Sequence, residues 1–151
     1  MRLTQEGLAL LKELEGLRLK AYRCQAGAWT IGYGHTLGVK EGMVIDEKLA
    51  NKWLLSDIAN VELTFRAPLS KLNNNQISAL VILVFNVGIY GFKKSRLFKL
   101  LNNGGTIEDV QKEWLDWCHY RDHDSGLRKE SHGLLSRRKK EFALFIKPME
   151  N

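Results

Sequence analysis

A short apolar stretch, residues 77–85, most constrains how this chain can fold. Its sequence, Ile-Ser-Ala-Leu-Val-Ile-Leu-Val-Phe, is apolar on every side of a helix and shows no alternation of apolar and polar residues. A β-strand is possible by propensity, but the length of the stretch and the lack of alternation favour a helix. We therefore predict that residues 77–85 form the buried central helix of a lobe.

Helical signals also mark the N-terminal half of the chain. Leucines recur at helical spacing over residues 5–15, and Thr4 can cap the start of this segment. A longer helix is predicted over residues 46–65, with Asp46 as its N-cap and Pro68 at or beyond its end. Two helices are therefore expected before the central one.

The rest of the chain predicts one small sheet and more helices. Residues 17–39 combine glycines with aromatic and β-branched side chains, which favours an antiparallel sheet with tight turns. Gly88 and Gly91 are predicted to break the central helix, which the asparagines at 73–75 can cap. Further helices are predicted over residues 95–101, 106–118 and 134–146, with a polar loop over 121–133. The fold class is α+β and mostly helical, with a cleft between a sheet-bearing lobe and a helical lobe.

The net charge of the chain indicates which classes of partner it can attract. It carries 23 Lys and Arg against 17 Asp and Glu, a formal net charge of +6, which attracts polyanions such as nucleic acid, anionic lipid or an acidic cell wall. No nucleic-acid-reading motif accompanies the charge, so we expect no nucleic-acid partner. Lys12 and Glu13 interrupt the first apolar stretch too soon for a secretory signal, so we expect synthesis in a cytoplasm without an export signal.

The cysteines and histidines do not suggest a disulfide framework or a metal site. Cys24 and Cys118 are the only cysteines in the sequence, and we expect both as thiols. Cys118, His119 and His123 lie close in sequence but lack the further ligands at regular spacing that a zinc site needs. We therefore predict no metal and no cofactor.

Glu15 stands at the predicted end of the first helix, beside the sheet segment 17–39. A carboxyl group there can face polar groups of the hairpin across a shallow cleft and act as a general acid. Most Glu residues are surface charges, so a solvated helix end is an equal alternative. Cys24 and Thr30 fall on the same hairpin; taken alone, they are better explained as a small buried residue and a strand former.

A longer pattern connects these three residues. Glu15, Cys24 and Thr30 follow one another at intervals of nine and six positions, in the frame Glu-Gly-Leu-Arg-Leu-Lys-Ala-Tyr and Thr-Ile-Gly-Tyr-Gly-His. The chain thereby resembles the phage-type lysozymes, the endolysins of glycoside hydrolase family 24, which have Glu, Asp and Thr at these intervals. Shorter matches recur at Phe85-Asn86-Val87-Gly88, Gly91-Phe92, Gly133-Leu134 and Arg137-Arg138. The resemblance covers nearly the whole chain and fails at Cys24, where the family has Asp.

The resemblance implies a lysozyme-like, two-lobed fold in a single domain over residues 1–151. The sheet-bearing lobe would span residues 12–60, and the helical lobe would span residues 61–151 together with the N-terminal helix. The implied activity is hydrolysis of the β-1,4 bond between N-acetylmuramic acid and N-acetylglucosamine in bacterial peptidoglycan. Its implied purpose is lysis of the host cell at the end of phage infection.

The resemblance also implies roles for single residues. Glu15 would be the general acid, Cys24 would replace the Asp that holds the attacking water, and Thr30 would help to position that water. Arg137 would approach Glu15 from the last helix and orient it. The residues that would line the sugar cleft, each of which could instead be a cap or core residue, are Thr36, Phe85, Asn86 and Ser95.

Cys24 leaves three roles open. A thiol with an ordinary pKa of about 8.5 is mostly uncharged at neutral pH, so it stabilises positive charge less well than a carboxylate does. It is a better nucleophile than a carboxylate. Water positioning, action as a thiolate base and covalent attack on the anomeric carbon all remain, and we favour the first two.

The remaining candidates have plain structural interpretations. His35 is expected to support the hairpin, and Trp114 and Trp117 are expected in the core or between the lobes. Residues 138–140 are expected on a solvated face of the last helix; the functional alternative is attraction of this basic C-terminal helix to the anionic wall, to anionic lipid or to lipopolysaccharide.

The expected partner is bacterial peptidoglycan, met by a monomer. The protein would wait in the host bacterial cytoplasm and act on the wall from the periplasm after a holin, without direct contact, has permeabilised the membrane. Two rival hypotheses remain: a non-catalytic wall-binding protein that lost turnover at Cys24, and a basic polyanion-binding protein.

Overall fold

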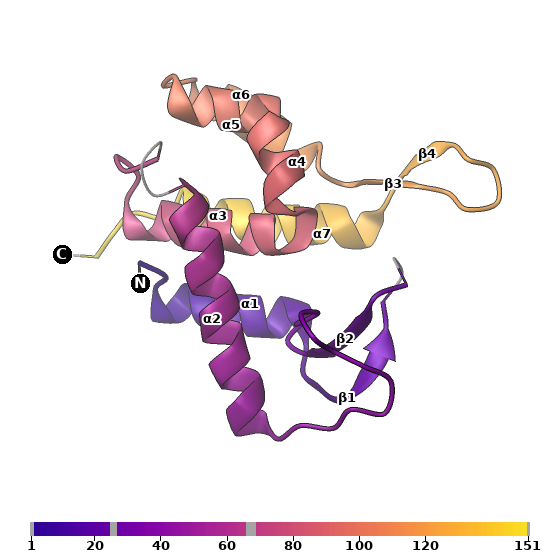
Figure 1. Ribbon diagram of the computed structural model, residues 1–151. Coiled ribbons are helices and arrows are strands. Elements are labelled where there is room, and N and C mark those ends of the chain that lie inside the picture. Colours follow the sequence, from indigo (N-terminus) through magenta and orange to yellow (C-terminus); the bar gives the residue numbers. More distant parts are fainter. Residues whose placement is uncertain (1, 25–26, 66–68, 151) are drawn as a thin grey trace.

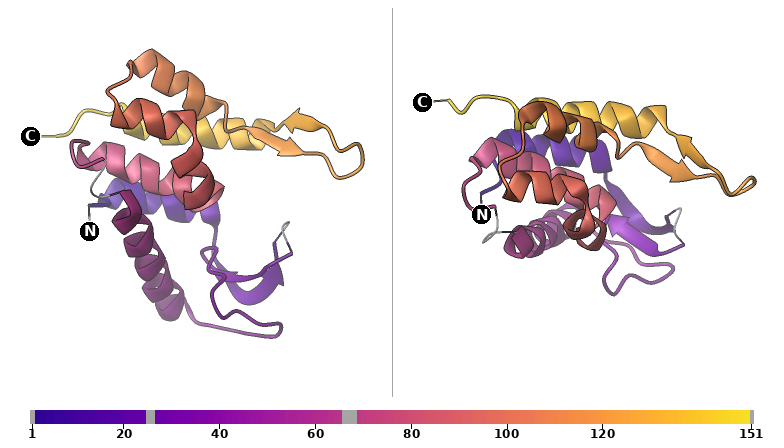
Figure 2. Two further views of the ribbon diagram at one scale, coloured as in Figure 1. Left: turned by 45° about the horizontal axis from the view of Figure 1, so that its top comes forward. Right: turned by 90° about the horizontal axis from the view of Figure 1, so that it is seen from above.

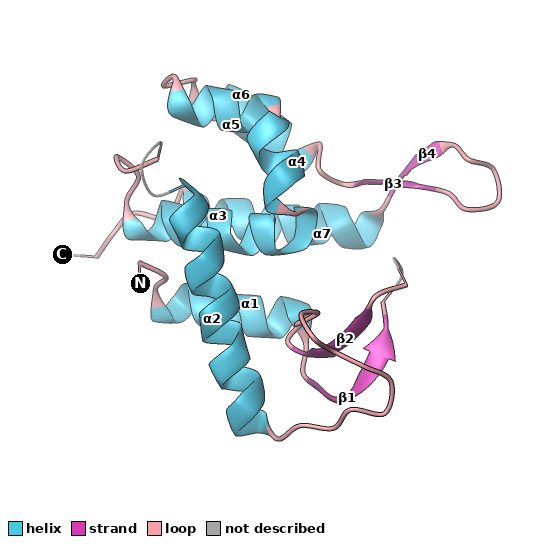
Figure 3. Ribbon diagram, in the orientation of Figure 1, coloured by secondary structure: helices cyan, strands magenta, loops and turns pink. Residues whose placement is uncertain are grey.

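The computed structural model describes residues 2–24, 27–65 and 69–150, and it is mostly helical (Figures 1 and 3). In chain order the elements are α1 (Gln5–Glu15), β1 (Arg18–Arg23), β2 (Trp29–Gly32), α2 (Glu47–Phe65), α3 (Asn74–Val87), α4 (Ile89–Lys94), α5 (Arg96–Asn102), α6 (Ile107–Leu115), β3 (His119–Arg121), β4 (Arg128–Glu130) and α7 (His132–Phe145).

Helix α3 is the centre of the fold. Every residue from Ile77 to Val84 is buried, and α3 packs against α1, α2, α4 and α7 (Figures 1 and 2). Asn73 starts the helix with a reciprocal capping box, in which its side chain accepts from Gln76 N and its own N–H donates to the Gln76 side chain. The prediction of a buried central helix over residues 77–85 is confirmed.

Helix α1 belongs to the helical part of the molecule although it comes first in the chain. It packs closely on α3 at Gly7, which has no Cβ. A Cβ at this position would lie 2.7 Å from Ser78 Cβ, so a larger residue would not fit without a shift. Thr4 caps it by accepting from Gly7 N at 3.0 Å, as predicted. Gly16, at φ +69°, ends it and turns the chain toward the sheet.

Strands β1 and β2 form a small antiparallel sheet, with Arg18 opposite Gly32 and Tyr22 opposite Thr30. Helix α2 contacts both β2 and α3, so it connects the sheet to the helical part (Figure 1). The expected α+β arrangement is therefore present. Among the described residues, no helix has the length and apolar character needed to cross a bilayer.

The C-terminal half corrects three predictions. Residues 121–133 are not a plain loop, because β3 and β4 form a projecting antiparallel hairpin there (Figure 1). Its strands are mostly exposed, so the apolar alternation that reveals a strand is missing. Gly91 lies inside α4 instead of breaking a helix, and α6 ends at Leu115, before Cys118. The expected role of Pro68 lies outside the described residues.

Candidate active site

Glu15 is the last residue of α1, and its carboxyl group lies at the junction of the sheet and the helices. Only 16% of its side chain is exposed, and Oε1 accepts from Arg137 Nη2 at 2.8 Å. A Cβ at Gly34 would lie 3.4 Å from Glu15 Oε2 and 3.8 Å from the Phe85 ring. The carboxyl group is therefore bordered by the turn after β2, by α3 and by α7, and the surface interpretation of Glu15 does not fit this placement.

Arg137 is fixed by more than its ion pair with Glu15. Its Nη2 also donates to Ile82 O at 3.1 Å, and its Nε donates to Glu141 Oε2 at 3.0 Å. The contact with Glu15 that the family resemblance implied is present. Because a planar guanidinium is held from three directions, it presents one defined N–H to the acid.

Behind Arg137 lies a buried polar network centred on Glu141. This carboxylate is fully buried and accepts from Arg138 Nη1 at 2.9 and 3.2 Å and from Trp114 Nε1 at 3.2 Å. Burial raises the pKa of Glu141, and the guanidinium groups of Arg138 and Arg137 oppose that shift. Glu141 thus holds both arginines of α7.

Arg138 corrects the expectation of a solvated basic face. Its side chain is fully buried, and its Nη2 donates to Asn86 Oδ1. Burial lowers the pKa of Arg138, with Glu141 acting against that shift. Lys139 and Lys140 are exposed as predicted, so the interpretation is wrong only for Arg138. The continuous network runs from Glu15 to Asn86.

Cys24 and Thr30 both donate to the carbonyl of Ala28, at the far end of the β1–β2 hairpin. Cys24 is half-buried, and its N–H donates to Ala28 O at 3.0 Å. Thr30 is buried, and its Oγ1 donates to the same carbonyl at 3.0 Å. Because the hydroxyl proton is used in this bond, the lone pairs of Oγ1 are left to accept a hydrogen bond.

A cavity of about 250 Å³ runs along the junction of the lobes. It contains Thr36 and Phe85, two of the four residues predicted to line a sugar cleft. Ser95 lies elsewhere, since it caps α5 by accepting from Phe98 N at 3.2 Å and lines a separate cavity. Asn86 is exposed and accepts from Arg138. The residues that line the cavity are Gly34, His35, Thr36, Leu37, Asp57, Val61, Val84, Phe85, Gly88 and Ile89.

His35 joins the turn after β2 to α2. Its Nδ1 lies 2.7 Å from Asp57 Oδ2, and its Nε2 donates to Leu37 O at 3.0 Å. The ring stacks on Trp53 with centroids 4.6 Å apart. His35 therefore supports the hairpin, as predicted. Sequence reasoning did not find Asp57, because nothing in the pattern links it to His35.

The remaining candidates lie away from the acid. Trp114 is buried in the core against Phe142 and Phe145. Burial raises the pKa of the Cys118 thiol. Within residues 2–24, 27–65 and 69–150, no three His, Cys, Asp or Glu side chains come together as metal ligands would.

A carboxyl group at the junction of two lobes, next to a cavity along that junction, is a candidate general acid beside a candidate substrate site. The chain belongs to the phage lysozyme family, whose sequence model matches residues 12–141. It is therefore a lysozyme-type hydrolase, and the family expectation from the sequence is confirmed.

Individual relatives agree over most of their length. The chain is 41% identical over 146 residues to an endolysin of Acyrthosiphon pisum secondary endosymbiont phage 1, which covers 96% of this chain and 98% of the relative. The muramidase domain of SpmX from Asticaccaulis excentricus matches with a TM-score of 0.88 at 30% identity, over 97% of this chain and 98% of that one. An endolysin from Escherichia coli O157:H7 phage FAHEc1 matches with a TM-score of 0.84 at 31% identity, over 97% and 94%. The expected lysozyme-like fold is confirmed.

Proposed function

We propose that this chain is an endolysin that hydrolyses the β-1,4 bond between N-acetylmuramic acid and N-acetylglucosamine, with Glu15 as the general acid. The observation that carries the proposal is the placement of Glu15: a mostly buried carboxyl group at the junction of the lobes, 2.8 Å from Arg137. Membership of the phage lysozyme family supports peptidoglycan as the substrate. The cavity next to Glu15 could hold the sugar chain.

In the proposed reaction Glu15 protonates the glycosidic oxygen as the bond to the anomeric carbon breaks. The ion pair with Arg137 exists only while Glu15 is a carboxylate, whereas proton donation needs the acid form. We propose that glycan binding loosens this pair, that Glu15 then takes up a proton from solvent before water is excluded, and that it donates this proton to the glycosidic oxygen. Arg137 is a positioning residue in this scheme.

The water that attacks the anomeric carbon is proposed to lie between Cys24 and Thr30. Thr30 Oγ1 donates to Ala28 O, so it can accept a hydrogen bond from this water. Cys24 is half-buried next to the same carbonyl and takes the place of the family's carboxylate. We propose that its sulfur holds the water or removes its proton, and does not form a covalent intermediate.

Product analysis on purified peptidoglycan tests the proposal. The parent should release muropeptides with N-acetylmuramic acid at the reducing end. Glu15→Gln should release none, while its circular dichroism spectrum and wall binding stay as in the parent. Full activity of Glu15→Gln would remove the acid assignment, and no release by the parent would favour a non-catalytic wall-binding protein.

Access to the wall is a separate part of the proposal. We propose that the protein accumulates in the host bacterial cytoplasm and reaches the wall once a holin opens the membrane. Expression in a bacterial host should leave cells intact until a holin is co-expressed, followed by rapid loss of turbidity. Lysis at the same rate without a holin would contradict this route.

A further inference from the structure

The acidic residues of this chain are unevenly distributed. No Asp or Glu occurs between Glu62 and Glu108, whereas six Lys and Arg residues do. Four of these cations belong to the short helices α4 and α5, and all four are exposed: Lys93, Lys94, Arg96 and Lys99. Together with Tyr90, which is 76% exposed, they form what we call the α4–α5 basic surface.

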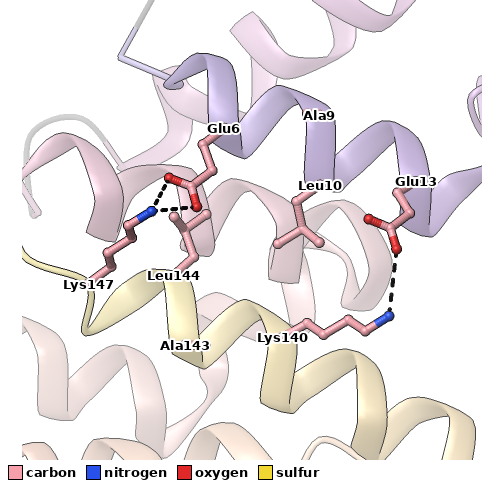
Figure 4. A pocket seen from close by; sticks show the side chains of 8 residues that line it. All are labelled: Glu6, Ala9, Leu10, Glu13, Lys140, Ala143, Leu144 and Lys147. Atoms are coloured by element: carbon pink, nitrogen blue, oxygen red, sulfur yellow. Dashed lines mark hydrogen bonds and ion pairs between the residues drawn. The ribbon is translucent and has the colours of Figure 1, made fainter.

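This surface is less neutralised than the basic face of α7. On α7, Lys140 lies 3.7 Å from Glu13, and just beyond it Lys147 reaches Glu6 at 2.8 Å (Figure 4). On α4 and α5, Arg96 pairs with Glu113 at 3.6 Å, but within the described ranges no carboxylate pairs with the three lysines. Three of the four cations of the α4–α5 basic surface thus have no carboxylate partner among the described residues, whereas Lys140 and Lys147 each have one.

The α4–α5 basic surface continues directly from the cleft. Gly88 and Ile89, where α4 begins, line the same cavity as Thr36. Lys93 lies one helical turn after Ile89 and so on the same side of α4. Lys94 stands over the Tyr90 ring, with Nζ 4.6 Å from its centroid. A polymer that left the cavity past Gly88 and Ile89 would run toward these side chains.

We propose that the α4–α5 basic surface binds the carboxylates of the peptide stems on the same peptidoglycan strand whose glycan lies in the cleft. The inference rests on the proposed function. Peptide stems carry free carboxylates at regular intervals along the glycan, and the surface offers unpaired ammonium groups at the exit of the cleft. Opposite charge and continuity with the cleft thus point to one occupant, and exposed contacts of this kind weaken with salt.

Two substrates distinguish binding of the peptide stem from binding of the glycan. Lys93→Gln/Lys94→Gln and the parent are compared on peptidoglycan that keeps its stems and on the same glycan after an amidase has removed them. On stem-bearing peptidoglycan at low salt, kcat/KM should fall about 2- to 10-fold in the variant, since each exposed ion pair contributes little. On stem-free glycan it should not change, and at high salt the loss should disappear.

A matched control removes the same charge elsewhere. Lys48 and Lys52, on α2, are exposed like Lys93 and Lys94. They lie four positions apart, and neither lines the cleft cavity. Lys48→Gln/Lys52→Gln should behave as the parent on both substrates. An equal loss in this control, an equal loss on stem-free glycan, or no loss in Lys93→Gln/Lys94→Gln would each overturn the inference.

The remaining outcomes keep the two proposals apart. A parent that cleaves neither substrate refutes the proposed function, whereas cleavage of both by parent and variant alike refutes only the stem contact. Co-sedimentation with phosphatidylglycerol–phosphatidylethanolamine vesicles tests the other anionic partner. A variant that loses vesicle binding but keeps its rate on stem-bearing peptidoglycan would assign the surface to lipid and overturn the inference.

Discussion

Arg137 reaches Glu15 across 122 positions of the chain and donates to its carboxylate at 2.8 Å. The two side chains come from the last and first helices, α7 and α1, both of which pack on α3. The orientation of the acid therefore depends on the packing of three helices. A substitution that shifts Arg137 can therefore change the orientation of Glu15 without contacting Glu15 itself.

Replacing Arg137 should reduce turnover more than substrate affinity. Arg137→Ala removes the N–H that orients Glu15, and a misplaced catalytic group costs about 100-fold in rate. Arg137→Lys should recover little, since an ammonium cannot contact Glu15, Ile82 O and Glu141 together as the guanidinium does. Steady-state kinetics on soluble glycan strands give kcat and KM separately. An unchanged kcat in Arg137→Ala would show that Glu15 needs no orienting group.

Glu141→Gln should destabilise the protein strongly. The substitution leaves the buried Arg138 without a carboxylate and leaves Arg137 with that of Glu15 alone, and breaking a buried ion pair costs about 3–5 kcal/mol. Chemical unfolding followed by circular dichroism measures this loss. The control is Glu13→Gln, whose exposed pair with Lys140 is expected to contribute at most about 1 kcal/mol. Equal losses in the two variants would show that burial of the network adds no stability.

Local patterns predicted the parts of the fold that local forces determine. The apolar stretch became the buried core of α3, and Thr4 and Asn73 cap the helices they were expected to start. The β3–β4 hairpin was missed because its strands are mostly exposed and have no apolar alternation to reveal them. Propensity and periodicity therefore fail where a strand does not contribute to the core.

In the candidate site, too, local sequence patterns predicted some residues and tertiary contacts determined others. Glu15 was found through a pattern of nearby residues, whereas the buried state of Arg138 depends on a tertiary contact with Asn86. One local signal was available: Glu141 follows Arg138 by three positions and Arg137 by four, which places all three on one side of a helix. A run of basic residues with a single acid at this spacing can be buried as a network.

Cys118 should make the folded state weaker at alkaline pH. Burial, with help from Glu130 and Asp116, raises the pKa of its thiol in the folded state, so the unfolded chain loses this proton first. The resulting stability is fully present below the ordinary thiol pKa of about 8.5 and is lost as the pH rises through the folded-state value. Unfolding midpoints measured between about pH 7 and 10 should therefore fall more steeply for the parent than for Cys118→Ala. Parallel curves would contradict a buried, protonated thiol.

Cys24 should react with thiol reagents before Cys118 and should reduce activity when it does. Cys24 is half-buried, whereas Cys118 is buried, so alkylation of the native protein should modify Cys24 first and slow muropeptide release. Cys24→Asp restores the carboxylate of the family and should be active and insensitive to the reagent. Cys24→Ala should lose most of its rate, because nothing then holds the attacking water opposite Thr30. If Cys24→Ala matches the parent, the sulfur has no chemical role, and a trapped glycosyl adduct seen by mass spectrometry would replace water positioning with covalent attack.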